Sequence, residues 1–313
     1  MRAVRSAGES VQIARIAEPQ ASPAGETVVV DVASSGICGT DLHLLSNGIE
    51  VTMGHEFAGV LADGTAVCVQ PSVPCGTCDG CEAGNEQVCR THLERMYGVS
   101  LDGGLADKVL VDRKCLVPLP AGVAPGIGAL VEPLAVAVHA MHQGGVHAGH
   151  RVLVVGGGTI GLTTVAAALA GGADVDVVVR HDHQREAADA LGAGLDPSGE
   201  YDVTFDAAGS QSALDMAIGH VRPAGSVVAV GLYWEPVKIG VGLLTKEVRL
   251  VPAFMYGHHH GAREFVQATA ILAATPMVAD ALITHRFGLD EAPEAFRVAA
   301  DRKSGSIKVL LTP

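Results

Sequence analysis

The feature that most constrains the fold is a change in the pattern of apolar residues at His150, after which strand-like runs alternate with alanine-rich helical stretches. The order is RVLVV, TIGLTTVAAALA, VDVVV and QREAADALGA, and it continues through DVTFD, SALDMAIGHV and SVVAVGL. Short apolar runs separated by helices of this length are typical of βαβ units, which build a parallel sheet. The sequence therefore predicts an α/β fold that contains a doubly wound, parallel-sheet domain.

The first turn of this alternation is rich in glycine and lies between a strand and a helix. In that context glycines let the backbone approach a pyrophosphate, and the helix N-terminus offers free N–H groups. An ordinary glycine turn is the alternative, but the strand–turn–helix setting favours a Rossmann dinucleotide site. The predicted cofactor residues here are Gly156, Gly158, Thr159, Ile160 and Gly161, with Gly231 at the end of SVVAVGL.

The strand VDVVV ends at Arg180 and His181, where an NAD-specific enzyme would place an acidic residue to hold the ribose hydroxyls. An arginine there favours a 2′-phosphate, so NADP is predicted over NAD. Asp176 lies too early, inside the strand, and Asp182 lies too late to replace the missing acid. The alternative is that Arg180 is only a solvated residue at a strand end.

The rest of the chain has a different pattern, with short β-branched runs that are broken by glycine or proline between Val28 and about Pro118. This pattern is typical of an irregular, mainly β domain. The tail holds one expected helix, EAPEAFRVAAD, and one strand, IKVLL, which resembles the N-terminal part. We therefore expect a mainly β domain over residues 1–134 and 271–313, and a dinucleotide-binding domain over residues 135–270.

Composition narrows the classes of partner. At 313 residues and 48% hydrophobic content, the chain is long enough for two packed domains. Its net charge of −13 would repel a phosphate backbone, so nucleic acid is not expected as a partner. No run reaches the length of a membrane span, and the first residues do not resemble an export signal, so a cytoplasmic location is expected.

Four of the seven cysteines crowd into fifteen residues, with the spacing Cys-x2-Cys-x2-Cys-x7-Cys. Without an export signal, such crowding indicates metal ligation before disulfides. Soft sulfur donors in a closed four-coordinate set suit a structural zinc, although an iron–sulfur cluster has similar spacing. The predicted ligands of this structural zinc are Cys75, Cys78, Cys81 and Cys89.

Two segments upstream supply a second set of donors. GICGTDLH contains Cys38, and TMGHEFAG contains His55 and Glu56. A lone cysteine or histidine is more often a structural residue than a ligand. Together with the four-cysteine loop, however, a thiolate, an imidazole and a carboxylate indicate a catalytic zinc, which needs three protein ligands and an open fourth position.

The order of GICGTDLH, GHEFAG, the four-cysteine loop, EPLAVAVHA and VGGGTIG resembles that of the zinc-containing medium-chain dehydrogenases. The segment VEPLAVAVHA is closest to the sorbitol and threonine dehydrogenase branch. The resemblance implies a GroES-like catalytic domain, a Rossmann domain, two zinc ions, and a homodimer or homotetramer. It also implies hydride transfer between a nicotinamide and a small or medium secondary alcohol or ketone.

The resemblance also implies roles for single residues. Cys38 and His55 would bind the catalytic zinc, with Glu56 and Glu132 exchanging between direct ligation and contact through water. Asp41 would orient His55, because ligating imidazoles usually donate their other N–H to a carboxylate. Thr40 would pass the alcohol proton toward the cofactor ribose, and His43 would carry it to water. Thr40 could alternatively cap the following helix, and the two roles are compatible.

The chain departs from the family pattern in ways that concern the substrate. The connection between Leu45 and His55 is short, and so is the stretch between Gly59 and Thr65. Polyol-oxidising relatives carry an Arg-Tyr pair in the segment matching residues 254–257, where this chain has Met255 before Tyr256. A less polar alcohol than a sugar alcohol is therefore expected. The adjacent run, His258 to His260, could bind stray metal but fits a solvated loop better.

Three other classes of protein compete with this interpretation. A zinc-free quinone or enoyl reductase of the same fold would not need Cys38, His55 and Glu132 together. A non-catalytic NADP-binding protein would not need the intact ligand and relay residues. A metal-storage protein would leave the dinucleotide turn unexplained.

Overall fold

The computed structural model describes residues 1–45, 48–301 and 303–313. Its contacts divide the chain into two compact units. The first unit comprises Met1–Glu132, His260–Ala273 and Ile283–Pro313, and the second comprises Pro133–His259 and Ala274–Leu282. The connection from Leu45 to His55, predicted to be short, includes residues 46 and 47, which lie outside the described residues.

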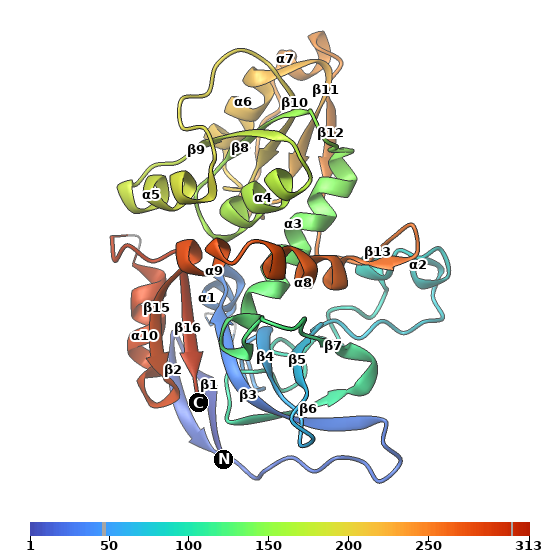
Figure 1. The fold of residues 1–313 in the computed structure, drawn as a ribbon, viewed down its shortest axis with the longest axis vertical. Coiled ribbons are helices and arrows are strands. Elements are labelled where there is room, and N and C mark those ends of the chain that lie inside the picture. The colour runs from blue at the N-terminus through green and yellow to red at the C-terminus, as the bar shows by residue number, and fades with distance from the viewer. Residues whose placement is uncertain (46–47, 302) are drawn as a thin grey trace. The chain divides into compact units, whose positions relative to one another are not determined.

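The first unit is built on a mainly antiparallel sheet in which β3 is central (Figure 1). The strand order is β15, β16, β3, β4, β5 and β7, and β6 also pairs with β3. The alternating burial of β3 and β6 is typical of strands with one face on a core. The strands are β3 (Thr27–Ile37), β4 (Glu56–Val60), β5 (Ala66–Val69), β6 (Lys108–Asp112), β7 (Leu116–Pro118), β15 (Ile283–Gly288) and β16 (Lys308–Thr312).

Short helices and a separate hairpin complete this unit. The expected tail helix and last strand are confirmed as α10 and β16, and the strand packs against β3. The helices are α1 (Gly39–Leu45), α2 (Asp79–Glu82), α8 (Glu264–Ala274), α10 (Ala292–Ala300) and the 3-10 turns η1 (Glu86–Val88), η2 (Arg113–Cys115), η3 (Pro125–Leu130) and η4 (Leu289–Glu291). The remaining strands are β1 (Arg2–Ala7), β2 (Ser10–Arg15) and β14 (Ala262–Arg263).

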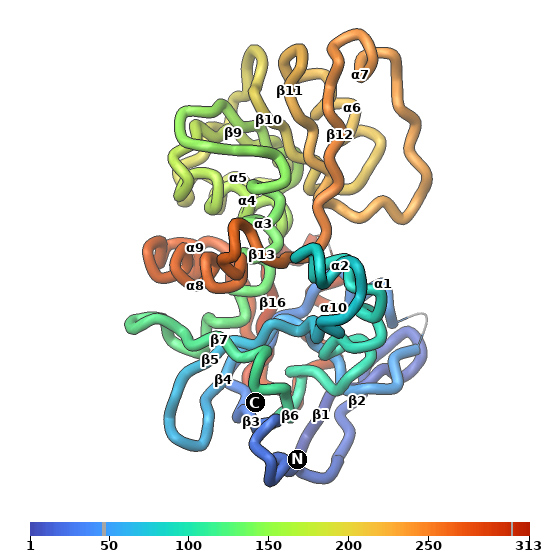
Figure 2. Tube along the Cα trace, turned by 90° about the vertical axis from the view of Figure 1, so that its right-hand side faces the viewer, coloured from blue at the N-terminus to red at the C-terminus, as the bar shows by residue number. Residues whose placement is uncertain are grey.

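The second unit is a five-stranded sheet whose neighbouring strands are all parallel, in the order β12, β11, β10, β8, β9. Strands β8 and β10 are buried almost throughout, as expected for strands covered on both faces. Figure 2 shows β12 and α7 at one side of this unit and β9 with α5 at the other. The strands are β8 (Arg151–Val155), β9 (Asp174–Val178), β10 (Tyr201–Asp206), β11 (Val221–Ala229), β12 (Arg249–Pro252) and β13 (His258–His259).

The helices of the second unit alternate with its strands as the sequence predicts. Helix α4 packs on β8 and β9, and α6 packs on β8, β10 and β11. The helices are α3 (Val131–Gly144), α4 (Thr159–Ala170), α5 (Asp182–Leu191), α6 (Gln211–His220), α7 (Val241–Thr245) and α9 (Met277–Leu282). The predicted combination of a β-rich GroES-like unit and a Rossmann-type sheet is confirmed. None of the helices in the described residues is both long enough and apolar enough to cross a bilayer.

The two units do not end where the predicted domains end. Residues 260–270 group with the first unit, in which Arg263 donates a hydrogen bond to the side chain of Gln70 at 2.7 Å. Helix α9 groups with the second unit because it packs on α4 and α5. The functional division into residues 1–134 with 271–313, and 135–270, stays a prediction.

Candidate functional site

The first donor segment is fixed by the transition from β3 to α1. Cys38 directly follows β3, and the carboxylate of Asp41 turns back so that its Oδ2 accepts a hydrogen bond from the Cys38 N–H at 2.8 Å. Asp41 is fully buried. A carboxylate at this place satisfies a donor that the first turn of a helix otherwise leaves open. The local fold therefore fixes the backbone that carries the Cys38 thiol.

The same aspartate also faces the second donor segment. Asp41 Oδ1 lies 3.3 Å from Nδ1 of His55, although the two atoms lack the alignment of a hydrogen bond. Burial disfavours the charged imidazole, but the charges of Asp41 and Cys38 outweigh it and raise the pKa of His55 well above its ordinary value. The position expected for Asp41 is thus the one observed, next to the Nδ1 edge of His55.

The donor atoms of Cys38, His55 and Glu56 all lie within 4.8 Å of one another. His55 and Glu56 are buried, and Cys38 is half-buried. A thiolate, an imidazole and a carboxylate at this spacing form a donor set that suits zinc. Glu132, which lies in the first turn of α3 and is also buried, does not belong to this close group. The structure therefore brings together three of the four predicted ligands.

Glu56 has a partner that the sequence analysis missed. The ammonium of Lys308 lies 2.8 Å and 2.6 Å from the two carboxylate oxygens of Glu56, and it donates to the carbonyl of Ile37 at 3.0 Å. Burial disfavours the charged amine, but the Glu56 carboxylate outweighs it and raises the pKa of Lys308. The available signal was the lone lysine in the apolar strand IKVLL, because a buried charge requires a partner.

A glycine makes room for this ion pair. Gly36 in β3 stands opposite Glu56 in β4 and opposite Leu310 in β16. A Cβ atom on Gly36 would lie 2.0 Å from Oε2 of Glu56. The glycine of GICGTDLH is therefore required by the close approach of the Glu56 carboxylate.

The predicted relay residues lie together on α1. Thr40 is half-buried in the first turn of α1, and His43 is exposed one turn later. Residues three apart on a helix are neighbours on its surface. Thr40 lies inside the helix rather than before it, so the alternative role as the cap residue is not observed; the side chain of Asp41 bonds the Cys38 N–H instead.

The four-cysteine loop folds back on itself around α2 and η1. Cys75 and Cys78 have their sulfurs 3.9 Å and 3.6 Å from that of Cys81, and the Cys75 N–H donates to the sulfur of Cys89 at 3.3 Å. All four cysteines are free, and their sulfurs lie within 4.8 Å of one another. A hydrogen bond from the backbone of Thr77 lowers the pKa of Cys75 to about 6. This closed thiol cluster fits a four-coordinate metal ion.

The glycine turn in the second unit has the geometry of a phosphate cradle. Gly156 has a φ of +126°, and a Cβ on Gly161 would lie 1.9 Å from the Gly156 carbonyl oxygen. Gly158 caps α4, and the space around its Cα is open, so a ligand can approach the N-terminal turn of α4. Gly231 also sits in a close backbone approach, because its Cβ would lie 2.3 Å from the Gly209 nitrogen.

The end of β9 carries a cation and no acid at the predicted position. Arg180 is exposed, and its guanidinium lies 3.5 Å from the Ser212 hydroxyl. His181 caps α5, where the side chain of Gln184 accepts from the backbone N–H groups of both residues. Asp176 lies inside β9, and its carboxylate already accepts a hydrogen bond from the Tyr201 hydroxyl at 2.6 Å.

Comparison with known proteins decides the family. The family model for the alcohol dehydrogenase GroES-like domain matches residues 24–121, and that for the glucose dehydrogenase C-terminus matches residues 126–312, more than half of the chain. The chain belongs to the zinc-containing medium-chain dehydrogenases. It is accordingly an oxidoreductase that acts on alcohols.

Individual members of this dehydrogenase family match over almost the whole chain. L-threonine 3-dehydrogenase of Pyrococcus abyssi is 30% identical over 96% of this chain and 95% of its own. Sorbitol dehydrogenase of Bacillus subtilis is 27% identical over 92% and 90%. A zinc-binding dehydrogenase of Sinorhizobium meliloti, solved with NADP bound, has a TM-score of 0.90 and 31% identity, covering 100% of this chain and 99% of its own. These matches confirm the resemblance to the sorbitol and threonine dehydrogenase branch.

The Glu56–Lys308 pair generates a stability prediction. Lys308→Met should lower the free energy of unfolding by about 3–5 kcal/mol, because it leaves the buried Glu56 carboxylate without a counter-charge. The double variant Lys308→Met with Glu56→Gln should recover most of this loss. The measurement is urea unfolding at matched zinc content, with Lys108→Met as the control. Lys108 pairs with Glu18 and Asp31 at the surface, so its loss should cost less than about 1 kcal/mol.

If the double variant is as unstable as Lys308→Met alone, the cost comes from lost packing, and the ion pair does not hold this part of the structure.

Proposed function

We propose that this dehydrogenase is a zinc- and NADP-dependent enzyme that interconverts a small or medium secondary alcohol and its ketone. The proposal is supported most directly by the close group of donor atoms from Cys38, His55 and Glu56. The same chain also has a glycine turn whose geometry suits a dinucleotide. Its NADP-bound relative supports the choice of a nicotinamide cofactor.

The catalytic zinc would be held by Cys38, His55 and one carboxylate. Glu56 belongs to the close group of donors but is engaged by Lys308 through both oxygens, whereas Glu132 lies outside that group. We therefore propose that the two carboxylates exchange between direct ligation and contact through water, and that Glu56 neutralises Lys308. Zinc bound there would lower the pKa of a substrate hydroxyl or polarise a ketone carbonyl, and the nicotinamide would take or give the hydride. Asp41 would hold His55 with its Nε2 edge free for ligation.

The chain's own residues supply the path for the proton. Thr40 in the first turn of α1 would accept the proton that the alcohol releases and pass it toward the cofactor ribose. His43, one turn later and exposed, would exchange it with water. An imidazole titrates in the range that suits this exchange.

The four-cysteine loop would bind a second, structural zinc. Its four sulfurs form a closed set with no place for a substrate, so this ion would hold the loop and contribute to folding. The sequence spacing alone also allowed an iron–sulfur cluster, and metal analysis separates the two.

The substrate is proposed to be less polar than a sugar alcohol. Met255 is buried and stands where polyol-oxidising relatives have an arginine, so a cation for a hydroxyl-rich ligand is missing at that position. The neighbouring histidine run lies in β13 and the turn after it, which fits a structural loop. Turnover with a panel of secondary alcohols would exclude both a non-catalytic NADP-binding protein and a metal-storage protein.

We also propose that the enzyme is a homo-oligomer that pairs through β12, as a homodimer or as part of a homotetramer. β12 is an edge strand of the parallel sheet, and the segment before it exposes several large apolar side chains. An unpaired edge beside apolar surface favours pairing with an identical edge about a twofold axis. The exposed residues are Trp234, Ile239, Val241 and Leu244.

Zinc content and turnover test the two metal sites. Wild-type protein should hold two zinc ions per chain, and Cys38→Ser should lose one of them together with turnover while its affinity for NADPH stays unchanged. Cys89→Ser should lose the other ion and unfold at lower urea, because structural zinc contributes to folding free energy. The measurements are elemental analysis of desalted protein, turnover with secondary alcohols and ketones, and NADPH fluorescence. A zinc-replete Cys38→Ser variant with full turnover would refute the catalytic site.

Cofactor choice tests Arg180. A guanidinium can form a charge-assisted bidentate contact with a 2′-phosphate, and such a contact is worth roughly 1.5–3 kcal/mol, so NADPH should bind about ten- to a hundredfold more tightly than NADH. Arg180→Asp should reverse this order, because the carboxylate repels the phosphate and accepts from the ribose hydroxyls. The dissociation constants of NADPH and NADH measure the effect. The control is Arg185→Asp in α5, the helix that follows β9, because it makes the same change of charge. Equal binding of both cofactors to the wild type would make Arg180 a bystander.

Light scattering tests the oligomer. The wild type should be a dimer or tetramer, and Leu244→Glu combined with Val241→Glu should shift it to monomer, because two buried charges per copy would oppose the interface. The control is Met277→Glu, which places the same charge on an exposed apolar residue of α9, away from β12. This variant should keep the mass of the wild-type oligomer. A monomeric wild type would end the oligomer proposal.

A further inference from the structure

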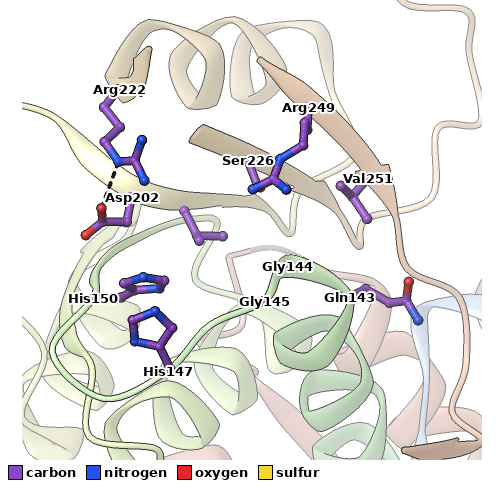
Figure 3. Close-up of a pocket in the computed structure, with 11 residues that line it drawn as sticks. Gln143, Gly144, Gly145, His147, His150, Asp202, Arg222, Ser226, Arg249 and Val251 are labelled. Carbon is purple, nitrogen blue, oxygen red and sulfur yellow. Dashed lines mark hydrogen bonds and ion pairs between the residues drawn. The ribbon is translucent and has the colours of Figure 1, made fainter. Parts of the chain in front are cut away.

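Figure 3 shows a pocket of the second unit, which has a volume of about 350 Å3. The pocket lies at the end of the sheet opposite the glycine turn at Gly156. The turn at Gly156 follows the carboxyl end of β8, whereas the pocket is lined from the amino ends of β10, β11 and β12 and from the loop that enters β8. Because these strands are parallel, their carboxyl ends lie at one end of the sheet and their amino ends lie at the other. The glycine turn and the pocket are therefore at opposite ends of the strands. The pocket is thus separate from the predicted cofactor and zinc residues.

One wall of the pocket is a row of residues across three strands. Val203 in β10 is aligned with Ser226 in β11, which is aligned with Arg249 in β12, so their side chains emerge on the same face of the sheet. Ser226 is 2% exposed and lies in the wall of the pocket. A hydroxyl in the wall of a pocket can donate a hydrogen bond to a ligand or accept one from it.

The wall is completed by an irregular stretch of β11 that places a second arginine over the pocket. The register of the β10–β11 pair shifts between Tyr201–Val221 and Val203–Ser226. Residues 222–225 of β11 therefore have no paired residue in β10 and form a bulge in the strand. Ala224 within it has a φ of +59°, a left-handed conformation that alanine rarely adopts. Such strained backbone persists only where its surroundings hold it, and it is concentrated at functional sites.

The charge of the lining is positive in a chain whose net charge is −13. Arg222 donates to Asp202 at 2.8 Å, and the other oxygen of Asp202 accepts from the Arg151 backbone N–H at 2.9 Å. Arg249, in contrast, has no ion pair within the described residues. Asp202 therefore offsets Arg222, and the Arg249 guanidinium is left as an uncompensated cation.

Two histidines face these arginines from the loop before β8 (Figure 3). The rings of His147 and His150 lie 3.3 Å apart between centroids, and the buried Nδ1 of His150 has no hydrogen-bond partner among residues 1–45, 48–301 and 303–313. Burial and the neighbouring His147 lower the pKa of His150, so its ring is a neutral donor or acceptor near pH 7. The guanidinium groups therefore supply the charge of this pocket, and His150 and Ser226 supply further hydrogen-bonding groups.

We propose that this pocket binds the phosphate group of a small metabolite at a site distinct from the cofactor site. Arg249 and Arg222 would contact the phosphate oxygens, since guanidinium groups match a phosphate in both charge and geometry. Ser226 and His150 would add hydrogen bonds, and Val203 and Val251 would contact a short carbon skeleton. The volume admits a compound of a few carbons and excludes a dinucleotide.

Binding is tested by calorimetry on the full chain, first without cofactor and then saturated with NADPH, in phosphate-free buffer of low salt. The probes are inorganic phosphate, glycerol 3-phosphate and glycerol. Both phosphates should bind the NADPH-saturated protein, and glycerol should not. Tighter binding of glycerol 3-phosphate identifies a phosphate ester as the ligand, and tighter binding of inorganic phosphate identifies the free anion.

Arg249→Gln should weaken phosphate binding by about tenfold or more, because a hydrogen bond to a charged group is lost. This variant breaks no ion pair among the described residues, and Ser226→Ala gives a second, conservative test with a smaller loss. The control is Arg297→Gln, an exposed arginine of α10 that carries the same charge change and should bind phosphate as the wild type does. Phosphate binding that disappears when NADPH saturates the protein, or that is unchanged in Arg249→Gln, overturns the proposal, as does absence of saturable binding at millimolar phosphate.

Discussion

The pairing of β3 with β4 on one side and β16 on the other is the constraint on which the candidate zinc site depends. Gly36 stands between Glu56 and Leu310 in this ladder, and Cys38 follows two residues later. The register therefore brings a thiol, a carboxylate and the Lys308 ammonium from three distant segments into one buried place. A shift of one residue in either pairing would move Glu56 or Lys308 to the opposite face of the sheet.

The cost of burying charge shapes the rest of this site. Glu56, Asp41 and Lys308 are each at most 2% exposed, so each needs a partner inside the protein. Glu56 has Lys308, and Asp41 has the Cys38 N–H and the edge of the His55 ring. None of these contacts involves the Cys38 thiol or the Nε2 edge of His55. These two groups can therefore serve as metal ligands, with Asp41 beside the opposite edge of the imidazole.

In the second unit, the parallel sheet places the predicted cofactor turn and the proposed phosphate pocket at opposite ends of its strands. The carboxyl end of β8 leads into the glycine turn and the N-terminus of α4, where backbone N–H groups face the open space at Gly158. The amino ends of the strands instead gather side-chain cations, because Arg222 and Arg249 both come near the starts of their strands. The predicted cofactor site would therefore contact phosphate through the backbone, and the proposed pocket would contact it through guanidinium groups.

Local spacing is what the sequence by itself determined. The alternation after His150, the glycine turn, the four-cysteine loop, and the Cys38 and His55–Glu56 segments were all predicted, since each depends on residues close together in the chain. Arg180 was likewise placed at the end of its strand by the preceding apolar run. The family resemblance, which also rests on local motifs, is confirmed by matches over nearly the whole chain.

Only the tertiary structure decided which distant residues meet. Lys308 pairs with Glu56 across 252 positions, and nothing in either segment alone specifies that contact. Glu132 was expected with the other ligands but lies outside their close group, because side-chain position depends on packing as well as on the motif. The pocket at Arg249 and Ser226 was invisible for the same reason: its wall is set by the register of three parallel strands, and register between strands is fixed by burial and packing across the sheet rather than by local sequence.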